Sequence, residues 1–318
     1  MPTLSATRIL QETLEAFRTR VPMLGAMSTN FDDRPIRLGE TVKAHITTLP
    51  TASTWDANTG YANGANEARS LMEDVDVVVD QHRFVTIKWG HINNITDQKD
   101  SITHMASNAA YVLGKAMVDS ILAKVTAANI SYNVGVLDAE ADRETLRDAR
   151  KLMNENGAAP LGRVIIGNSD FTGAFGDDPR IASRDYSGQQ TEADAFAHWR
   201  NIEGFGDIWE YPDFPANAHD LIGVAFESRA ICLRAGLPDH TFNLAQQLGI
   251  PAIANTEVVT DPDTGFSLLG ITWQQPGTFE LATTLAAVWG SAVGKQGGDA
   301  GTITDKAALR FVETTAGD

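Results

Sequence analysis

The amino-acid sequence predicts an α+β protein in which one long helix joins an extended pair of strands to a body of mixed helices and strands. Three observations predict this fold class. Residues 97–128 carry apolar side chains at three- and four-residue steps and contain no proline, as in a long amphipathic helix. Residues 41–48 and 74–89 alternate apolar and polar side chains, as half-buried strands do. Shorter helix and strand patterns follow from residue 132 onward.

The segment 97–128 is the element around which we expect the rest of the chain to be arranged. Thr96 or Asp97 can cap its start, and at the α-helical rise its length would be roughly 45 Å. Its apolar stripe consists of Ile102, Met105, Ala106, Ala109, Val112, Leu113, Ala116, Met117, Ile121 and Val125. A long helix with one apolar face, joining a protruding hairpin to a compact body, is typical of an assembling protein more than of an enzyme.

Composition argues against several classes of protein. The 318 residues can bury a large core and suggest two domains. The formal net charge of −16 argues against a protein that binds nucleic acid through its phosphates, although not against one that encloses nucleic acid. The single cysteine, Cys232, allows no internal disulfide and no cysteine-based zinc site, so we expect a small buried side chain. No apolar run reaches the roughly 18 residues that would indicate a membrane span.

The first 37 residues are predicted to form an arm. Residues 4–21 have the pattern of a short amphipathic helix that carries Leu10, Leu14 and Phe17 on one face and is stopped by Pro22. Residues 25–37 show neither helical nor strand periodicity, and we expect this stretch to make its contacts with partners elsewhere. The charges of the arm are nearly balanced, whereas a DNA-binding arm would be strongly basic.

A long connection rich in Asn, Gly, Ala, Thr and Ser separates the strands predicted at 41–48 and 74–89. A connection of roughly 20 residues without structure of its own is uncommon inside a compact domain. We therefore predict a long hairpin whose tip packs on a neighbouring subunit, with Trp55 and Tyr61 as its aromatic anchors. A disordered surface loop is the equally supported alternative.

An acidic face is predicted on the second of these strands. Alternation places Asp74, Asp76 and Asp80 on one side. Such carboxylates could hold a metal ion, but no matching second cluster occurs in the sequence. We interpret the face as solvated or as lying between subunits.

The rest of the chain is predicted to consist of short helices and strands. Helices are expected at 142–156 and 191–202, and Asn168, Ser169 or Asp170 can cap a further one. Residues 229–235 continue as strand or helix. Further strands are expected at 132–137, 164–166, 204–215, 221–226, 257–260, 266–273, 278–288 and 309–312.

Two stretches, together with the order of the parts, carry a resemblance to a known family. Residues 204–215 read GFGDIWEYPDFP, and residues 221–238 read LIGVAFESRAICLRAGLP. In these stretches and in the order of its parts, the chain resembles the major capsid proteins of tailed bacteriophages, whose fold is named after the phage Hong Kong 97. The second stretch is similar to the Ala-Phe-x-x-x-Ala-Ile pattern of that family, although Glu227 stands where the family often has histidine.

The resemblance implies an α+β fold of the Hong Kong 97 type and a division of the chain into parts. These would be the N-terminal arm at 1–37, the extended hairpin loop at 38–92, the spine helix and peripheral domain at 93–203, the axial domain at 204–255, and a return to the peripheral domain at 256–318.

The same resemblance implies a structural coat protein whose hexamers and pentamers form an icosahedral virion around double-stranded DNA. The DNA would be enclosed without sequence-specific binding, no membrane would be involved, and the head would be assembled in the host bacterial cytoplasm. A separate scaffolding protein and a portal are the expected partners. The candidate inter-subunit contacts are Trp55, Tyr61, Leu10, Leu14 and Phe17.

The enzyme alternative finds little support in the sequence. Residues 167–171 lack the second glycine of a nucleophile elbow, and residues 204–209 lack the third glycine of a dinucleotide fingerprint. The seven histidines show no zinc-ligand spacing, so we predict no catalytic residue, no cofactor and no metal. Two alternatives stay open: an encapsulin-type compartment that carries cargo enzymes in place of DNA, and a soluble α/β hydrolase or sugar-binding protein.

Overall fold

The computed structural model describes a large part of the chain. The described residues are 22–47, 55, 57–58, 72–89, 98–137, 141–178, 199–217, 220–228, 230–238, 253–260, 266–274, 281–294, 296–297, 303–304 and 306–314. The helix predicted at 4–21 lies outside these ranges, and so do the candidate contact residues Leu10, Leu14, Phe17 and Tyr61.

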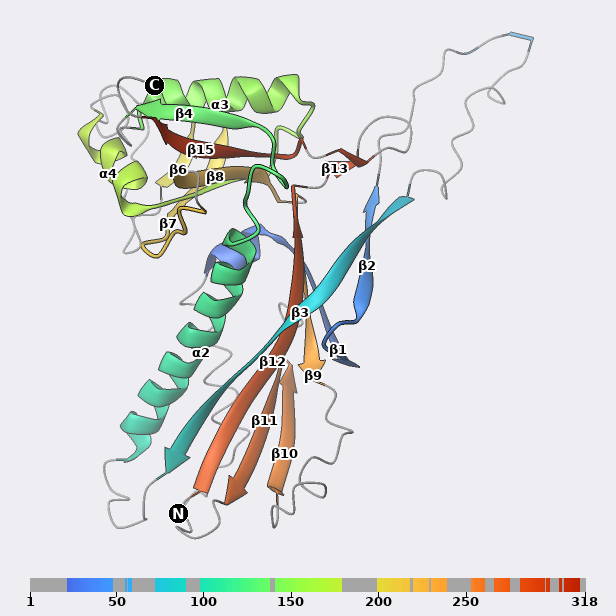
Figure 1. Ribbon diagram of the computed structural model, residues 1–318, viewed down its shortest axis with the longest axis vertical. Coiled ribbons are helices and arrows are strands. Elements are labelled where there is room, and N and C mark those ends of the chain that lie inside the picture. Colours follow the sequence, from blue (N-terminus) through green and yellow to red (C-terminus); the bar gives the residue numbers. More distant parts are fainter. Residues whose placement is uncertain are drawn as a thin grey trace.

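The elements form an α+β fold with two main sheets, one above the other in Figure 1, and a long helix that runs beside the lower sheet up to the upper one. The helices are η1 (Pro22–Ala26, a 3-10 helix), α2 (Gln98–Leu122), α3 (Arg143–Glu155) and α4 (Ser169–Asp177). The strands are β1 (Ser28–Ile36), β2 (Thr41–Thr47), β3 (Met72–Trp89), β4 (Asn133–Leu137), β5 (Arg163–Gly167), β6 (Trp199–Ile202), β7 (Phe205–Glu210), β8 (Leu221–Glu227), β9 (Ile231–Pro238), β10 (Ile253–Thr260), β11 (Ser267–Gln274), β12 (Leu281–Val293), β13 (Gln296–Gly297), β14 (Ile303–Thr304) and β15 (Ala308–Thr314).

The lower sheet follows the order β1-β9-β12-β11-β10, and β3 joins it by pairing along β12. β1 runs parallel to β9, and the other neighbours are antiparallel. Residues 25–37 show no periodicity in the sequence, yet residues 28–36 form β1 and pair within the same chain. The lack of periodicity did not reveal this strand, because strand pairing is made by backbone groups and does not require alternating side chains.

The upper sheet follows the order β4-β15-β8-β5-β7-β6, with α3 and α4 beside it in Figure 1. β6 and β7 form a hairpin closed by the two residues Glu203 and Gly204, whose φ angles are 49° and 90°. Both angles are positive, as a two-residue hairpin turn of the primed type requires. Residues 199–202, the end of the helix predicted at 191–202, form strand β6 instead. The predicted boundary between the peripheral and axial domains, at residue 204, falls inside this hairpin.

Helix α2 is shorter than predicted, about 37 Å at the α-helical rise. Its buried side chains follow rows of four-residue steps, such as Ala109, Leu113, Met117 and Ile121. Met105 and Val112 were assigned to the buried stripe but are 44% and 51% exposed. Val112 precedes Leu113 by one residue and therefore points about 100° away from this row, whereas Met105 continues the row one step before Ala109, at a position that is not covered.

Two apolar cores lie on opposite faces of the upper sheet. One contains side chains of α2 together with residues of both sheets, such as Leu285 of β12 and Val164 and Ile166 of β5. The other packs α3 and α4 against the far face, where Ile165 of β5 and Phe171 of α4 lie. Strands β5 and β8 are therefore buried on both faces, which explains why their sequences are continuous apolar runs.

Candidate functional site

The feature of this molecule that projects furthest is the hairpin of β2 and β3. The two strands pair antiparallel from Thr41 opposite Val78 to Thr47 opposite Met72, and they lead away from the body in Figure 1. Val75 and Val77 are buried, whereas Asp74, Asp76 and Asp80 are exposed, as the alternation predicted. One ion pair across the hairpin joins Lys43 Nζ to Asp74 Oδ2 at 3.1 Å. The acidic face is thus open to solvent.

Trp55 lies in the connection between these two strands. The described part of that connection lies at the far end of the projection, well away from both sheets (Figure 1). The Trp55 side chain is 59% exposed. A large aromatic ring left in water at the end of a projection is typical of a contact residue whose partner is another molecule. The second predicted anchor, Tyr61, lies outside the described residues.

The hairpin has a rigid root where β3 meets β12. The Nζ atom of Lys124, just beyond the end of α2, lies 3.1 Å from Asp80 Oδ2 of β3 and donates to the carbonyl oxygen of Ser291 in β12 at 2.7 Å. Gly290 of β12 lies opposite Val79 of β3, where the register of the two strands shifts. The backbone of β3 passes so close there that only glycine fits. These contacts set the direction in which the hairpin leaves the body.

The C-terminal half of α2 is tied to the upper sheet by polar contacts. Asn217 Nδ2, in the loop after β7, donates to the carbonyl oxygens of Leu122 at 2.8 Å and Val125 at 2.6 Å. Leu122 is the last residue of α2 and Val125 lies in the segment that follows, so these two bonds fix the end of the helix. Trp289 Nε1 of β12 donates to Ser120 Oγ at 2.8 Å. Helix α2 is therefore held by both sheets.

A second polar cluster on α2 joins the same loop. The Tyr211 hydroxyl donates to Asp119, and Lys115 Nζ lies 3.1 Å from Asp119 Oδ2 and 3.2 Å from Asp213 Oδ2. Burial, followed by the hydrogen bond to Asp119, raises the pKa of Tyr211 far above its ordinary value. The cluster holds the loop after β7 against the outward side of α2.

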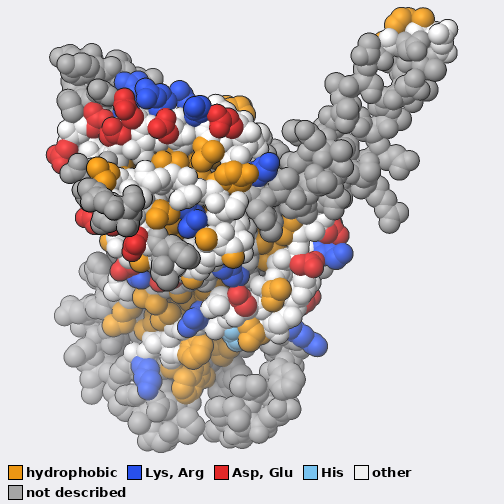
Figure 2. Space-filling view, turned by 45° about the horizontal axis from the view of Figure 1, so that its top comes forward, with side chains coloured by type: hydrophobic (Ala, Val, Ile, Leu, Met, Phe, Trp, Pro, Cys, Tyr) orange, Lys and Arg blue, Asp and Glu red, His pale blue; other side chains and the backbone are white. Residues whose placement is uncertain are grey.

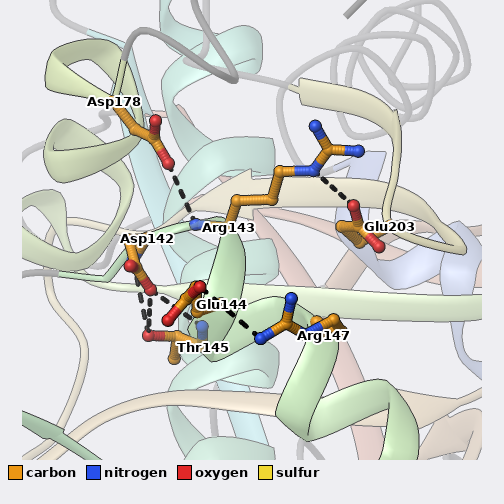
Figure 3. Close-up of polar contacts among 7 residues, drawn as sticks. All are labelled: Asp142, Arg143, Glu144, Thr145, Arg147, Asp178 and Glu203. Atoms are coloured by element: carbon orange, nitrogen blue, oxygen red, sulfur yellow. Dashed lines mark hydrogen bonds and ion pairs between the residues drawn. The ribbon is translucent and has the colours of Figure 1, made fainter.

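The start of α3 forms a charged rim on the upper domain (Figure 3). Asp142 Oδ1 accepts from the Thr145 backbone at 2.8 Å and Thr145 Oγ1 accepts from the Asp142 backbone at 3.4 Å, which makes a capping box. The Arg143 backbone donates to Asp178 Oδ2 at 3.1 Å. With these bonds the first turn of α3 is held in place, and its side chains point outward in fixed directions.

Four charged side chains line an open hollow of about 200 Å³ beside this turn: Arg143, Glu144, Arg147 and Glu203. Glu203 is bound by Arg143, and its Oε2 lies 3.2 Å from Arg150 Nη1. Arg147 Nη2 lies 3.6 Å from Glu144 Oε1. Figure 2 shows basic and acidic side chains mixed along this upper rim. Each carboxylate of the hollow faces a guanidinium, so the arrangement suits contact with a polar surface and offers no nucleophile paired with a base.

The part of the chain that the structure describes offers few other groups that could form a reactive or metal-binding site. No three His, Cys, Asp or Glu side chains in it gather closely enough to hold a metal ion. None of its helices is long and apolar enough to cross a membrane. Cys232 is buried, as predicted, and burial raises the pKa of its thiol.

The sequence pattern did not single out the residues that orient these surfaces. Lys124 and Asn217 showed no pattern, because each acts through contacts with segments distant in the sequence. Gly290 carried a detectable signal, since a glycine inside an apolar strand run indicates a close backbone approach. Glu203 and Gly204 gave only a weak signal of a turn, because Glu-Gly is a less typical two-residue hairpin turn than Asn-Gly.

No family model and no curated protein matches the chain. Solved structures do match along almost its whole length. The capsid structure of the cyanophage P-SCSP1u matches with a TM-score of 0.54 at 11% identity and covers 92% of this chain and 87% of that one. A structure from Mycobacterium phage Bobi matches with a TM-score of 0.51 at 15% identity, over 92% and 90%. The crystal structure of a virus-like particle from Pyrococcus furiosus matches with a TM-score of 0.50 at 10% identity, over 96% and 98%.

These likenesses show the fold. The chain has the mixed-sheet α+β fold with few helices that phage capsid structures share, as the resemblance implied. The hairpin, its root and the charged rim are the surfaces that this fold exposes.

Proposed function

We propose that the chain is a structural, non-enzymatic major capsid protein of a tailed bacteriophage. Hexamers and pentamers of it would form the icosahedral head that encloses double-stranded DNA. The observation that carries the proposal is the likeness to the cyanophage capsid structure over 92% of this chain. The net charge of −16 is compatible with a wall that surrounds DNA without sequence-specific binding.

In this proposal the described elements take the parts of a Hong Kong 97-type subunit. The hairpin of β2 and β3 is the extended loop, and α2 is the spine helix. A two-stranded ribbon is marginally stable by itself in water, so the hairpin gains from packing on a neighbouring copy. Its exposed Trp55 would be buried in that contact, and the charged rim on α3 would meet polar groups of a neighbour.

The proposal includes partners and a location. A separate scaffolding protein and a portal would act with the chain, assembly would take place in the host bacterial cytoplasm, and the product would be the virion head. The candidate contact residues Leu10, Leu14, Phe17 and Tyr61 belong to the same proposal, with no membrane involved.

The test is the size of the particles that the expressed chain forms. Sedimentation velocity and negative-stain microscopy would be run on the chain alone and together with a candidate scaffolding protein. We expect closed, icosahedral shells. A stable monomer or dimer under all of these conditions would contradict the proposal and would favour the soluble hydrolase or sugar-binding alternative.

A second candidate function is an encapsulin-type compartment. The observation that favours it is the likeness to the Pyrococcus furiosus virus-like particle, which covers 96% of this chain and 98% of that one. Purified shells would be treated with nuclease and their contents analysed. Protected double-stranded DNA supports the phage head, whereas protein cargo without DNA supports the compartment.

A further inference from the structure

The hairpin of β2 and β3 packs on the body through a small apolar cluster of its own. Val75 and Val77 of β3 are 6% and 1% exposed and lie in one cluster with Cys232 of β9. Ala44 of β2 and Ala292 of β12 pack against this cluster. It is separate from the two main cores of the molecule, so it can open while those cores stay packed.

The backbone pairing of β3 changes partner at Val79. Residues 72–78 pair with β2, whereas residues 79–89 pair with β12 (Figure 1). Residues 41–47 and 72–78, which we call the outer hairpin, therefore have no strand partner in the body among the described residues. Side-chain packing holds them there, and β13 lies beside β2. A segment held in this way opens at a lower cost in free energy than the core strands do.

A hinge lies at the same level in both strands of the hairpin. In β3 the register with β12 shifts between Val79 and Gln81, so Asp80 is the extra residue of a β-bulge. The turn that precedes β2 contains Gly39, whose φ angle is 87°. The Gly39 backbone donates to the Val79 carbonyl oxygen at 2.8 Å, and the Val79 backbone donates to the carbonyl oxygen of Glu40 at 2.9 Å. The two strands are thus joined to each other where they leave the body, which lets them move as one unit.

Lys124 holds this hinge against the body. Its Nζ atom lies 3.1 Å from Asp80 Oδ2 and donates to the Ser291 carbonyl oxygen at 2.7 Å. Asp80 belongs to the bulge and Ser291 to the body strand β12, so the contact spans the two sides of the hinge. The ion pair of Lys43 with Asp74, by contrast, joins the two strands of the outer hairpin to each other.

We propose that the outer hairpin is a lid over Cys232, which opens as one unit about the hinge at Asp80 while both sheets stay folded. Strand β9 keeps its place in the open state, because Cys232 pairs with Ser28 of β1 on one side and with Ala292 of β12 on the other. The hairpin can then change its direction on an unchanged body. The proposal concerns the unassembled subunit and does not depend on shell formation.

Thiol labelling tests the proposal, because Cys232 is the single cysteine of the chain and is 8% exposed. Purified, unassembled subunit would be treated with a maleimide reagent, and its labelling rate compared with that of the urea-unfolded chain. When closing is faster than labelling, the rate reports the population of the open state. We expect low concentrations of urea to change this rate little, because lid opening exposes little surface. A rate that rises with urea as steeply as global unfolding does would overturn the proposal.

A matched pair of substitutions separates the lid from the core. Val77→Ala should raise the labelling rate about tenfold, because it removes apolar contact between the lid and the body. The control is Val224→Ala, the same change at a fully buried side chain of the main core. It destabilises the closed and open states alike, so the labelling rate should not change. Equal acceleration by both variants, or none by Val77→Ala, would overturn the proposal.

A second pair of variants tests the hinge at the surface of the molecule. Lys124→Met removes the charge that holds Asp80 and should raise the labelling rate about threefold. Lys43→Met is the control, since its ion pair lies within the outer hairpin and is kept or lost without effect on opening. Equal labelling rates for the two variants would contradict a hinge at Asp80.

Detachment of β1 is the other route by which Cys232 could become accessible, because β1 pairs with β9 beside it. Leu24→Ala weakens the packing of η1, which directly precedes β1, on the main core. We expect it to leave the labelling rate unchanged. Acceleration as large as that caused by Val77→Ala would assign the opening to β1 and would overturn the lid.

Discussion

Replacing Gly290 by alanine should weaken the junction from which the hairpin leaves the body. A Cβ atom at this position would lie 2.2 Å from the Val78 carbonyl oxygen, 2.7 Å from the Val78 carbonyl carbon and 2.8 Å from the Val79 Cα atom. All three atoms belong to the backbone of β3, so the clash cannot be relieved by rotating a side chain. β3 and β12 would have to separate where their register shifts.

The size of the effect follows from this geometry. Overpacking in a buried region costs about 1–3 kcal/mol, and each ladder hydrogen bond weakened by the separation adds about 1 kcal/mol. We therefore expect the free energy of unfolding to fall by about 3 kcal/mol. The contact of Lys124 with Asp80 and with Ser291 would be disturbed too, so the hairpin would also lose its fixed direction.

The assay is urea unfolding of the unassembled subunit, followed by circular dichroism. Gly206→Ala is the matched control, because Gly206 also lies in a strand and the nearest atom to its added Cβ, the Arg163 carbonyl oxygen, is 3.7 Å away. We expect a clearly lower unfolding midpoint for Gly290→Ala and little change for Gly206→Ala. Equal midpoints for the two variants would show that β3 and β12 are not as close as the structure places them.

Three further predictions concern α2, the hairpin tip and the loop after β7. Ala109→Asp would bury an unpaired charge at a position that is 2% exposed, which should cost several kcal/mol of stability and abolish soluble subunit. Asn108→Asp, at the exposed neighbouring position, should be tolerated. Expression level and thermal unfolding of the two variants test this difference. Trp55→Ala should leave the subunit folded by circular dichroism but reduce the yield of shells in sedimentation, and loss of folding would place Trp55 in the core instead. Burial and the bond to Asp119 raise the pKa of Tyr211 above its ordinary value of about 10. Above about pH 10 this hydroxyl therefore ionises more readily in the unfolded chain than in the folded one. Stability from this group should therefore be complete below about pH 10 and fall above it, and Tyr211→Phe should make the fall shallower in thermal unfolding across that range.

Several elements could be predicted because their information is local. The alternation of Val75 and Val77 with Asp74 and Asp76 predicted both the strand β3 and its exposed acidic face. Asp142 was recognised as the start of α3, and the apolar run of β5 was recognised as a buried strand. Each of these depends on side chains within a few residues of one another, which the sequence displays directly.

The surfaces that carry the proposed function depended on long-range contacts. Trp55 was identified as a candidate anchor from its setting in the connection, but its position at the end of a projecting hairpin required the pairing of β2 with β3. The hollow lined by Arg143 and Glu203 required the hairpin of β6 and β7, whose first strand occupies the end of a predicted helix.

By itself the sequence determined that this chain is an α+β protein with a long helix, a long hairpin and two-sided buried strands, because side-chain periodicity records which face of an element avoids water. Only the tertiary structure decided that residues 28–36 pair with β9, that the upper sheet contains strands from both sides of residue 204, and that Met105 and Val112 are exposed. The physical reason is that strands recognise each other through backbone groups common to every residue, and the buried row of a helix is selected by the element packed against it.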